Sequence, residues 1–324
     1  MSFDRVRVDF GQSIRLRVPP MSDPYPRLSL DLVDVTAGPR GTLLANWCDA
    51  VERRELTRPA ARRVAAAEAT SLHLEVVVQY APNGEIVAQW EIWTTAVMLE
   101  YRPLAEGRLL GYSRCSSDVD NVFIYDTDGT VRSSGRLAQG IIDVAVLDNE
   151  AMLVAYDRYF TDDLGAVLGL AMYTPNLERM DVGDGSGYLP SQLTVSGDAV
   201  QFWDRNSSLI ISSERGKPIW PDQTQRFFGP LEPEWVLHSF GAERWALVGS
   251  VSSSSISVIL GVVEGGLWQS VGELLIDKRS SSNHRGEVVS CNGSTLHYCI
   301  GRQWHTLSID DLFEEWESEQ ALKP

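Results

Sequence analysis

The sequence is poor in three features that would each point to a definite class of protein: cysteine, long apolar runs and positive charge. Its four cysteines are too few for a scaffold held together by disulfides. No apolar run approaches the roughly 20 residues that a membrane-spanning helix needs. The first ten residues alternate charged and apolar side chains and lack the apolar stretch of a signal peptide. We therefore expect a soluble, cytoplasmic protein that does not bind a membrane.

Positive charge is scarce relative to negative charge. The chain has 28 Lys and Arg against 44 Asp and Glu, a formal charge of −16. Binding to nucleic acid through its phosphates needs clustered Lys and Arg. The one basic cluster, Arg53 to Arg63, is interleaved with Glu52 and Glu55, which is typical of a solvated helix face. The charge therefore predicts no nucleic-acid binding and makes a basic protein the more fitting partner.

Recognised catalytic and metal-binding patterns are also missing. His297 and Cys299 lie two apart, so they share one face of a strand, and Cys291 lies across a turn from them. No fourth ligand and no C-x-x-C spacing accompany them, so we predict no metal and no cofactor. A Cys291–Cys299 disulfide is conceivable, but a reducing compartment disfavours it. Asp128-Gly129 is typical of a hairpin turn rather than a calcium loop.

What the chain has is a succession of short segments rich in β-branched and aromatic residues, separated by turn residues. Groups of four such segments lie near 96–137, 141–183, 190–221 and 234–270. Their spacing of roughly 40 to 45 residues matches one blade of a β-propeller. The alternating pattern and this period together predict an all-β fold.

Two further blades account for the ends of this region. One is formed by 286–306, completed by the opening segments 5–10 and 13–18, which would close the ring. The other has 27–35, 71–80 and 85–93 as its strands. We predict a single β-propeller of about six blades over residues 1–307, with seven blades, or a pair of β-sandwiches, as alternatives.

Two segments have helical rather than strand-like patterns. Residues 49–69 are rich in Ala, Arg and Glu and predict a short helical insertion broken at Pro59. Residues 308–322 predict a helix within a C-terminal unit, 308–324, with Ser308 as N-cap and Asp311 three residues on. Its apolar face consists of Ile309, Leu312, Phe313 and Trp316. We expect this helix to cap one blade; a partner-binding helix is the alternative.

The segment from Arg102 to Asp157 carries a pattern of Asn-x-x-apolar-aromatic-Asp-x-x-Gly, followed after a spacer by Gly-Ile-x-Asp-apolar. In this chain these positions are Asn121, Ile124, Tyr125, Asp126, Gly129, Gly140, Ile141 and Asp143. The segment resembles a group of uncharacterised bacterial β-propeller-like proteins common in actinobacteria. Those proteins continue with a Trp and an acidic-glycine turn, which are missing from this chain after Leu153. The resemblance implies a propeller blade and no particular activity.

The turns between second and third strands of successive blades should open on one face of the ring. Ligands and partners often bind such loop faces. The candidate partner-binding residues there are Asp118, Asp120, Asp157, Tyr159, Asp162, Asp163 and Asp204; the turn 252–255 is placed on the same face. We therefore expect a non-enzymatic interaction or ligand-binding protein, for example an immunity-type protein that neutralises a basic toxin. A hydrolase or lyase with carboxylates in the propeller channel and a sensor of a small ligand or metal are the alternatives.

Overall fold

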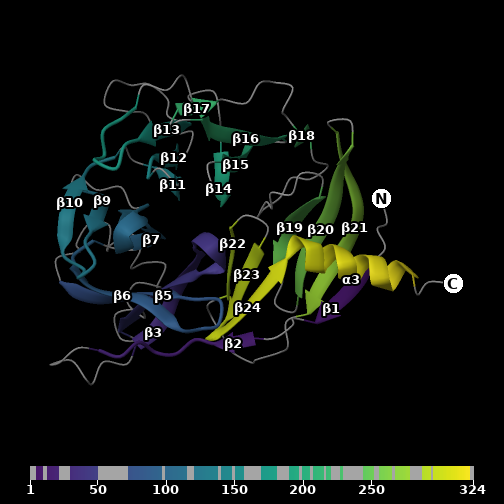
Figure 1. Cartoon of the computed structure of the whole chain (residues 1–324), viewed down its shortest axis with the longest axis horizontal. Helices are drawn as coiled ribbons and strands as arrows, with labels where there is room; N and C mark the ends of the chain where they lie inside the picture. The colour runs from purple at the N-terminus through teal and green to yellow at the C-terminus, as the bar shows by residue number, and fades with distance from the viewer. Residues whose placement is uncertain are drawn as a thin grey trace.

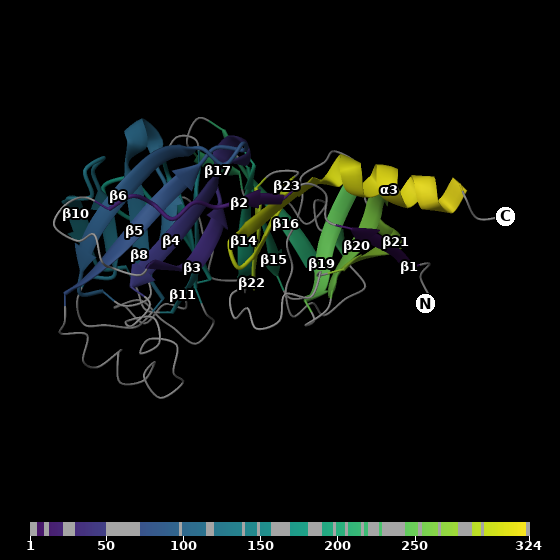
Figure 2. The same cartoon turned by 90° about the horizontal axis from the view of Figure 1, so that it is seen from below.

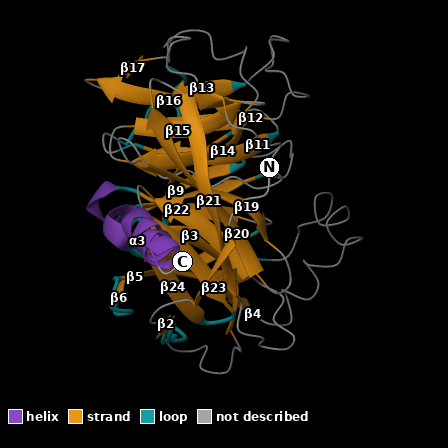
Figure 3. Ribbon diagram, turned by 90° about the vertical axis from the view of Figure 1, so that its right-hand side faces the viewer, coloured by secondary structure: helices purple, strands orange, loops and turns teal. Residues whose placement is uncertain are grey.

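The computed structural model describes most strands and one α-helix of the chain. The residues described are 5–9, 13–21, 30–49, 72–96, 99–114, 120–137, 140–147, 150–156, 169–180, 190–196, 199–204, 207–214, 217–219, 227–228, 244–251, 255–264, 267–277, 287–292 and 295–321. These residues form six sheets, numbered here in chain order, and the fold is mostly β as predicted (Figures 1 and 3).

The first two sheets are four-stranded antiparallel meanders, in which each strand pairs with the next along the chain. The first sheet comprises β3 (Leu30–Ala37), β4 (Leu43–Asp49), β5 (His73–Tyr80) and β6 (Ile86–Thr94). The second comprises β7 (Leu99–Pro103), β8 (Leu109–Ser113), β9 (Val122–Tyr125) and β10 (Val131–Gly135). Two short 3-10 turns, η1 (Pro39–Gly41) and η2 (Ala105–Gly107), join the first and second strand of each sheet.

The third and fourth sheets continue this antiparallel order. The third comprises β11 (Ile141–Val146), β12 (Met152–Tyr156) and β13 (Leu170–Tyr173). The fourth comprises β14 (Pro190–Ser196), β15 (Ala199–Asp204), β16 (Ser207–Glu214), β17 (Lys217–Ile219) and β18 (Phe227–Phe228).

The last two sheets each take a strand from the N-terminus. The fifth comprises β19 (Arg244–Val251), β20 (Ser255–Glu264), β21 (Leu267–Asp277) and β1 (Arg5–Asp9). The sixth comprises β22 (Glu287–Asn292), β23 (Thr295–Ile300), β24 (Gln303–Ser308) and β2 (Ser13–Arg15).

The predicted closure by the N-terminus is half right. Strand β2 pairs antiparallel with β24, with Ile14 opposite Trp304, so it completes the sixth sheet as predicted. Strand β1 does not join that sheet: it pairs in parallel with β21 of the fifth sheet, with Arg7 opposite Leu275. The two opening segments therefore link two different sheets.

The first strands of five sheets surround a common axis. In order around it, β3 contacts β7, β7 contacts β11, β11 contacts β14, β14 contacts β22, and β22 contacts β3 (Figures 1 and 2). The fifth sheet lies beside the sixth, farther from this axis, and α3 (Ile309–Ala321) lies along it. Side chains from the first strands of four successive sheets can therefore meet at the axis.

Hydrophobic clusters fill the spaces between sheets. Representative pairs are Trp90 and Tyr101 between the first and second sheets, Leu110 and Val154 between the second and third, Leu153 and Val200 between the third and fourth, Val258 and Tyr298 between the fifth and sixth, and Trp304 and Trp47 between the sixth and first. Each sheet thus buries apolar side chains against at least one neighbour, as layered β architectures require.

Strand β4 is an element that the sequence prediction missed. Residues 43–48 are all buried, because the strand lies inside the first sheet and is covered on both faces. The alternation of apolar and polar residues that marks a half-exposed strand is therefore absent from it.

The residues that carry the family resemblance have structural roles in the second and third sheets. Asn121 bonds the backbone N–H of Leu137 at 2.8 Å and the carbonyl of the same residue at 3.3 Å, fixing the connection after β10. Gly129 and Gly140 adopt positive φ angles of 82° and 80°. A Cβ atom on Gly129 would lie 2.5 Å from the carbonyl oxygen of Glu91. The pattern thus fixes the chain between the second and third sheets and the close approach of the second sheet to the first.

The predicted C-terminal helix is confirmed. The Asp311 N–H donates to the Ser308 Oγ at 3.0 Å, and the Ser308 N–H donates to the Asp311 carboxylate at 3.1 Å, a reciprocal capping arrangement. Phe313 is buried in the cluster between the fifth and sixth sheets, where Trp316 packs against it. Gly272 of β21 leaves room for the Trp316 indole, which a Cβ at that position would meet. The helix therefore caps one sheet, as expected.

The remaining expectations concern the helical insertion and a membrane-spanning helix. The helical insertion predicted at 49–69 lies outside the described residues, apart from Asp49 at the end of β4. In the part of the chain that the structure describes, no helix combines the length and apolarity that crossing a membrane requires.

Candidate functional site

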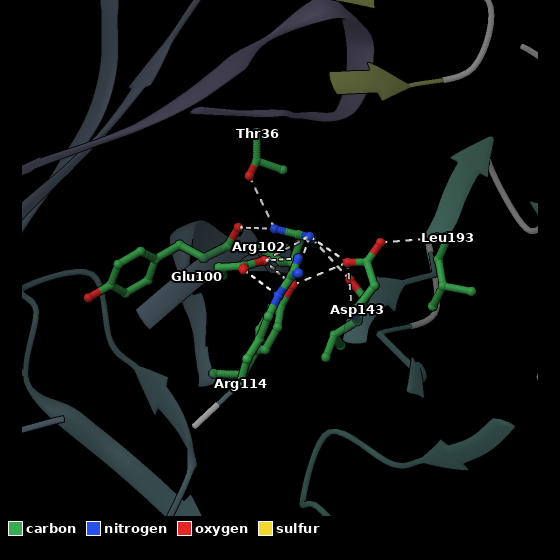
Figure 4. A network of polar contacts seen from close by, with 9 residues as sticks. Thr36, Glu100, Arg102, Arg114, Asp143 and Leu193 are labelled. Atoms are coloured by element: carbon green, nitrogen blue, oxygen red, sulfur yellow. Dashed lines mark hydrogen bonds and ion pairs between the residues drawn. The ribbon is translucent and has the colours of Figure 1, made fainter. Parts of the chain in front are cut away.

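Among the residues that the structure describes, an extensive polar network lies at the axis, where the first strands of the sheets converge, and its centre is Arg102 on β7 (Figure 4). The Arg102 Nη1 donates to the Thr36 hydroxyl of β3 at 3.1 Å and to its neighbouring carbonyl of Tyr101 at 2.9 Å. Its Nε donates to the carbonyl of Val144 on β11 at 3.0 Å. One guanidinium thus binds strands of three sheets.

Asp143 on β11 is the counter-charge of this arginine. The Arg102 Nη2 lies 2.7 Å from the Asp143 Oδ1, and the Asp143 side chain is only 7% exposed. The second carboxylate oxygen, Oδ2, accepts the backbone N–H of Leu193 on β14 at 3.0 Å. Because both oxygens have donors, this carboxylate is satisfied in the core. The Arg102–Asp143 half of the network therefore holds the inner strands of four sheets together.

The other half of the network is more open. Glu100, two residues before Arg102, accepts bonds from the Tyr112 hydroxyl at 2.7 Å and from the Arg114 Nη2 at 2.9 Å. The Arg114 side chain is 49% exposed and that of Glu100 is 21% exposed. Arg114 directly follows β8, at the end of the sheet from which the chain continues toward β9. The network thus runs from a buried ion pair to a partly exposed one.

Asp34 on β3 lies within electrostatic reach of Glu100, Arg102 and Arg114 and differs from the other carboxylates. Burial raises the pKa of Asp34 to about 6, with the negative charge of Glu100 as the second cause, and Arg102 offsets only part of this. Its hydrogen bond comes from the backbone N–H of Val35. Within the described residues it forms no ion pair. The axial site therefore holds three carboxylates and two guanidiniums, and Asp34 is the carboxylate that forms no direct ion pair, although Arg102 and Arg114 act on it from farther away.

A second polar cluster lies between the first and second sheets, away from the axis. The buried carboxylate of Glu75 on β5 accepts from the Asn46 Nδ2 at 2.8 Å and from the Tyr101 hydroxyl at 2.7 Å. The His73 Nε2 lies 3.2 Å from its other oxygen. Burial, together with the charge of Glu75, raises the pKa of Tyr101. All four side chains are buried, so this cluster contributes to cohesion between the sheets and offers less to a ligand than the axial site does.

The structure describes two of the seven residues predicted for partner binding. Asp120 precedes β9 and accepts a bond from the Ser134 hydroxyl, and Asp204 ends β15. The others, Asp118, Asp157, Tyr159, Asp162 and Asp163, lie outside the described residues. The three turns that contain these seven residues each connect the second and third strands of a sheet, as predicted. The turn near 252–255 connects β19 with β20, and the start of that predicted blade, from 234 to 243, lies outside the described residues, so its place in the blade and the partner-binding role of the seven residues stay predictions.

The structure bears on the predicted absence of a Cys291–Cys299 disulfide and on the candidate metal ligands. Cys299 is a free, buried thiol, and Cys291 pairs across the strands with Leu296, so these two cysteines do not form a disulfide. Burial raises the pKa of the Cys299 thiol to about 12 and lowers that of His297 to about 4. Among the residues that the structure describes, no three His, Cys, Asp or Glu side chains gather as a metal site would require.

The axial residues were missed in the sequence analysis, although a signal for three of them was present. Asp143 belongs to the Gly-Ile-x-Asp pattern, and it interrupts an apolar strand, IIDVAV. Glu100 and Arg102 likewise alternate with apolar residues at the start of a sheet. A charged side chain on an otherwise buried strand indicates a partner, but the sequence does not say which strand supplies it.

Comparison with known proteins adds little to this description. No protein-family model matches the chain, and no curated protein is similar to it in sequence. Among solved structures, a gluconolactonase from Xanthomonas campestris is 12% identical over 93% of this chain and 98% of its own, with a TM-score of 0.39. Hsv2 from Kluyveromyces lactis is 9% identical over 91% of this chain and 81% of its own, with a TM-score of 0.44. Both TM-scores lie below 0.5, so neither likeness carries weight for fold or function.

Proposed function

We propose that the chain is a β-propeller of six blades that binds a small molecule at the open half of the axial network. Three features of the sheets support the propeller: their meander order, the packing of neighbouring sheets face to face, and the completion of the sixth sheet by β2. The first strands of the fourth and sixth sheets, β14 and β22, contact each other directly. The fifth sheet therefore lies outside the inner circle of strands, and its blade is the least regular part of the ring.

The observation that carries the binding function is the unpaired carboxylate of Asp34. Arg102 and Asp143 satisfy each other and hold the sheets together, so that half of the network needs no ligand. Asp34 forms no ion pair within the described residues, and the charges of Arg102 and Arg114 compensate its charge only in part, next to the partly exposed Glu100–Arg114 pair. A carboxylate kept in such a position costs stability, and a bound molecule that pairs with it would recover that cost.

The experiment is a ligand-observed NMR screen of a library of small polar molecules against four forms of the protein. These are the unmodified chain, Asp34→Asn, Arg114→Gln, and Asp126→Asn as a control. Asp126 is 42% exposed and pairs with Arg132 on the second sheet, so its substitution changes the net charge equally but not the axial site. We expect ligands whose binding is lost in Asp34→Asn, altered in Arg114→Gln and kept in the control. Binding that is indifferent to both axial substitutions, or no binding at all, would refute the proposal.

A carboxylate-dependent hydrolase is a second candidate, and one observation favours it. A carboxyl group with a pKa of about 6 exchanges its proton near neutral pH, as general acids and bases do. Hydrolysis of nitrophenyl esters and glycosides would then follow the ionisation of Asp34 and disappear in Asp34→Asn. Turnover that persists in this variant would rule out the candidate.

A further inference from the structure

The charges of the axial site indicate which charge a ligand should carry. Asp34, Glu100 and Asp143 supply three negative charges, and Arg102 and Arg114 supply two positive ones. Arg102 has Asp143 at 2.7 Å, and Arg114 has Glu100 at 2.5 Å between Nε and Oε1. Each guanidinium therefore has its own carboxylate, and the site carries one uncompensated negative charge when Asp34 is ionised.

From this arrangement we infer that the ligand presents one cationic group, an ammonium or a guanidinium, to Asp34. The inference rests on the proposed function and names the chemical class of its ligand. An anionic ligand would need a guanidinium free of carboxylates, and both described at the axis are paired. A neutral ligand would leave the charge of Asp34 without compensation in a poorly solvated place.

The surroundings of Asp34 suit a compact cation. Asp34 and Thr36 are two residues apart on β3, so both side chains lie on the face of the strand that meets β7, where the Thr36 hydroxyl bonds Arg102. The chain as a whole carries a charge of −16, which raises the local concentration of any cation near its surface. Within the site, the Glu100–Arg114 pair is the part that solvent reaches, with side chains 21% and 49% exposed.

The test compares three probes that share one scaffold and differ in charge: benzylamine, benzyl alcohol and benzoate. We expect benzylamine to bind and the other two not to bind, as measured by ligand-observed NMR titration. Its affinity should fall about tenfold between pH 8 and pH 5, because roughly one-tenth of a carboxyl group with a pKa of about 6 is ionised at pH 5. Asp34→Asn should abolish the binding at both pH values, and Asp126→Asn should preserve it.

The possible outcomes separate this inference from the proposed function. If benzoate or benzyl alcohol binds and Arg114→Gln abolishes that binding, the axial site binds ligands but the inferred charge is wrong. If benzylamine binds with equal affinity to the unmodified chain and to Asp34→Asn, both the inference and the axial location are wrong. Because Asp34→Asn removes an unpaired charge and keeps the side-chain shape, we expect the variant to fold, and its melting curve verifies that.

Discussion

Arg102 and Asp143 are 41 residues apart in the chain and 2.7 Å apart at the axis. The same arginine reaches Thr36 of the first sheet, and the same aspartate holds the backbone of Leu193 in the fourth. A single ion pair thus connects the inner strands of four sheets. Its partners occupy most of the guanidinium donors, which makes the planar fork of arginine, and not charge alone, the property that matters.

Replacing Arg102 by lysine should therefore destabilise the protein although the charge is kept. Lysine cannot donate in the fixed directions of a guanidinium, so Asp143 and Thr36 lose donors in a buried place. We expect a loss of about 3 kcal/mol in the free energy of unfolding, measured by urea denaturation. Arg132→Lys, at the exposed pair with Asp126, should cost less than about 0.5 kcal/mol. Equal effects of the two substitutions would contradict the proposal that the buried Arg102–Asp143 pair holds the sheets together.

Asp34 should make stability fall as the pH rises. Its pKa is about 6 in the folded protein against 3.8 ordinarily, so the folded state binds the proton more tightly and is favoured at low pH. The unmodified chain and Asp34→Asn should be equally stable near pH 4. By pH 7 the variant should be the more stable by about 1–3 kcal/mol. Melting temperatures measured from pH 4 to 8 check this; parallel curves for the two proteins would be evidence against it.

His297 should act in the opposite direction. Burial lowers its pKa from 6.5 to about 4, so the folded state favours the neutral ring, which accepts the Trp304 indole N–H at 3.2 Å. The stability that results is complete above about pH 6.5 and is lost as the pH falls toward 4. His297→Gln should flatten the melting-temperature profile across this window. A melting-temperature profile that His297→Gln leaves unchanged would contradict the prediction.

The reciprocal capping of α3 predicts a local effect. Ser308→Ala leaves the Asp311 N–H without its acceptor, and we expect a cost of about 1 kcal/mol. Hydrogen exchange should show faster amide exchange in α3 and, because the helix caps the fifth sheet, in β21. Glu314→Gln on the exposed face of the helix should change neither. Unaltered exchange in the Ser308 variant would show that packing alone holds the helix.

Much of the fold could be predicted from local signals. The turn at Asp128-Gly129 requires a positive φ, which glycine supplies, and the hairpin forms there. The capping pair of α3 is visible as Ser308 and Asp311 in the sequence. Strand β4 was missed because burial on both faces removes alternation, and the pairing of β1 with β21 was missed because no local pattern selects a partner strand.

The candidate site was much less accessible to sequence reasoning. Its residues come from β3, β7, β8 and β11, and each is one charged position within a short strand. Only the convergence of first strands at the axis brings them together, and that convergence depends on the packing of whole sheets. The raised pKa of Asp34 likewise results from neighbours, not from its own sequence context.

The pairing of β2 with β24 also sets an order of events during synthesis. The Ser13 hydroxyl bonds the side chain of Gln303, 290 positions further along the chain. At roughly 5–20 residues per second, the ribosome needs on the order of 15–60 s to produce the second partner after the first. Throughout that time β2 has no strand to join, while the first four sheets can already assemble. The sixth sheet can therefore be completed only after nearly the whole chain has emerged, so its folding is post-translational even if the other sheets form during synthesis.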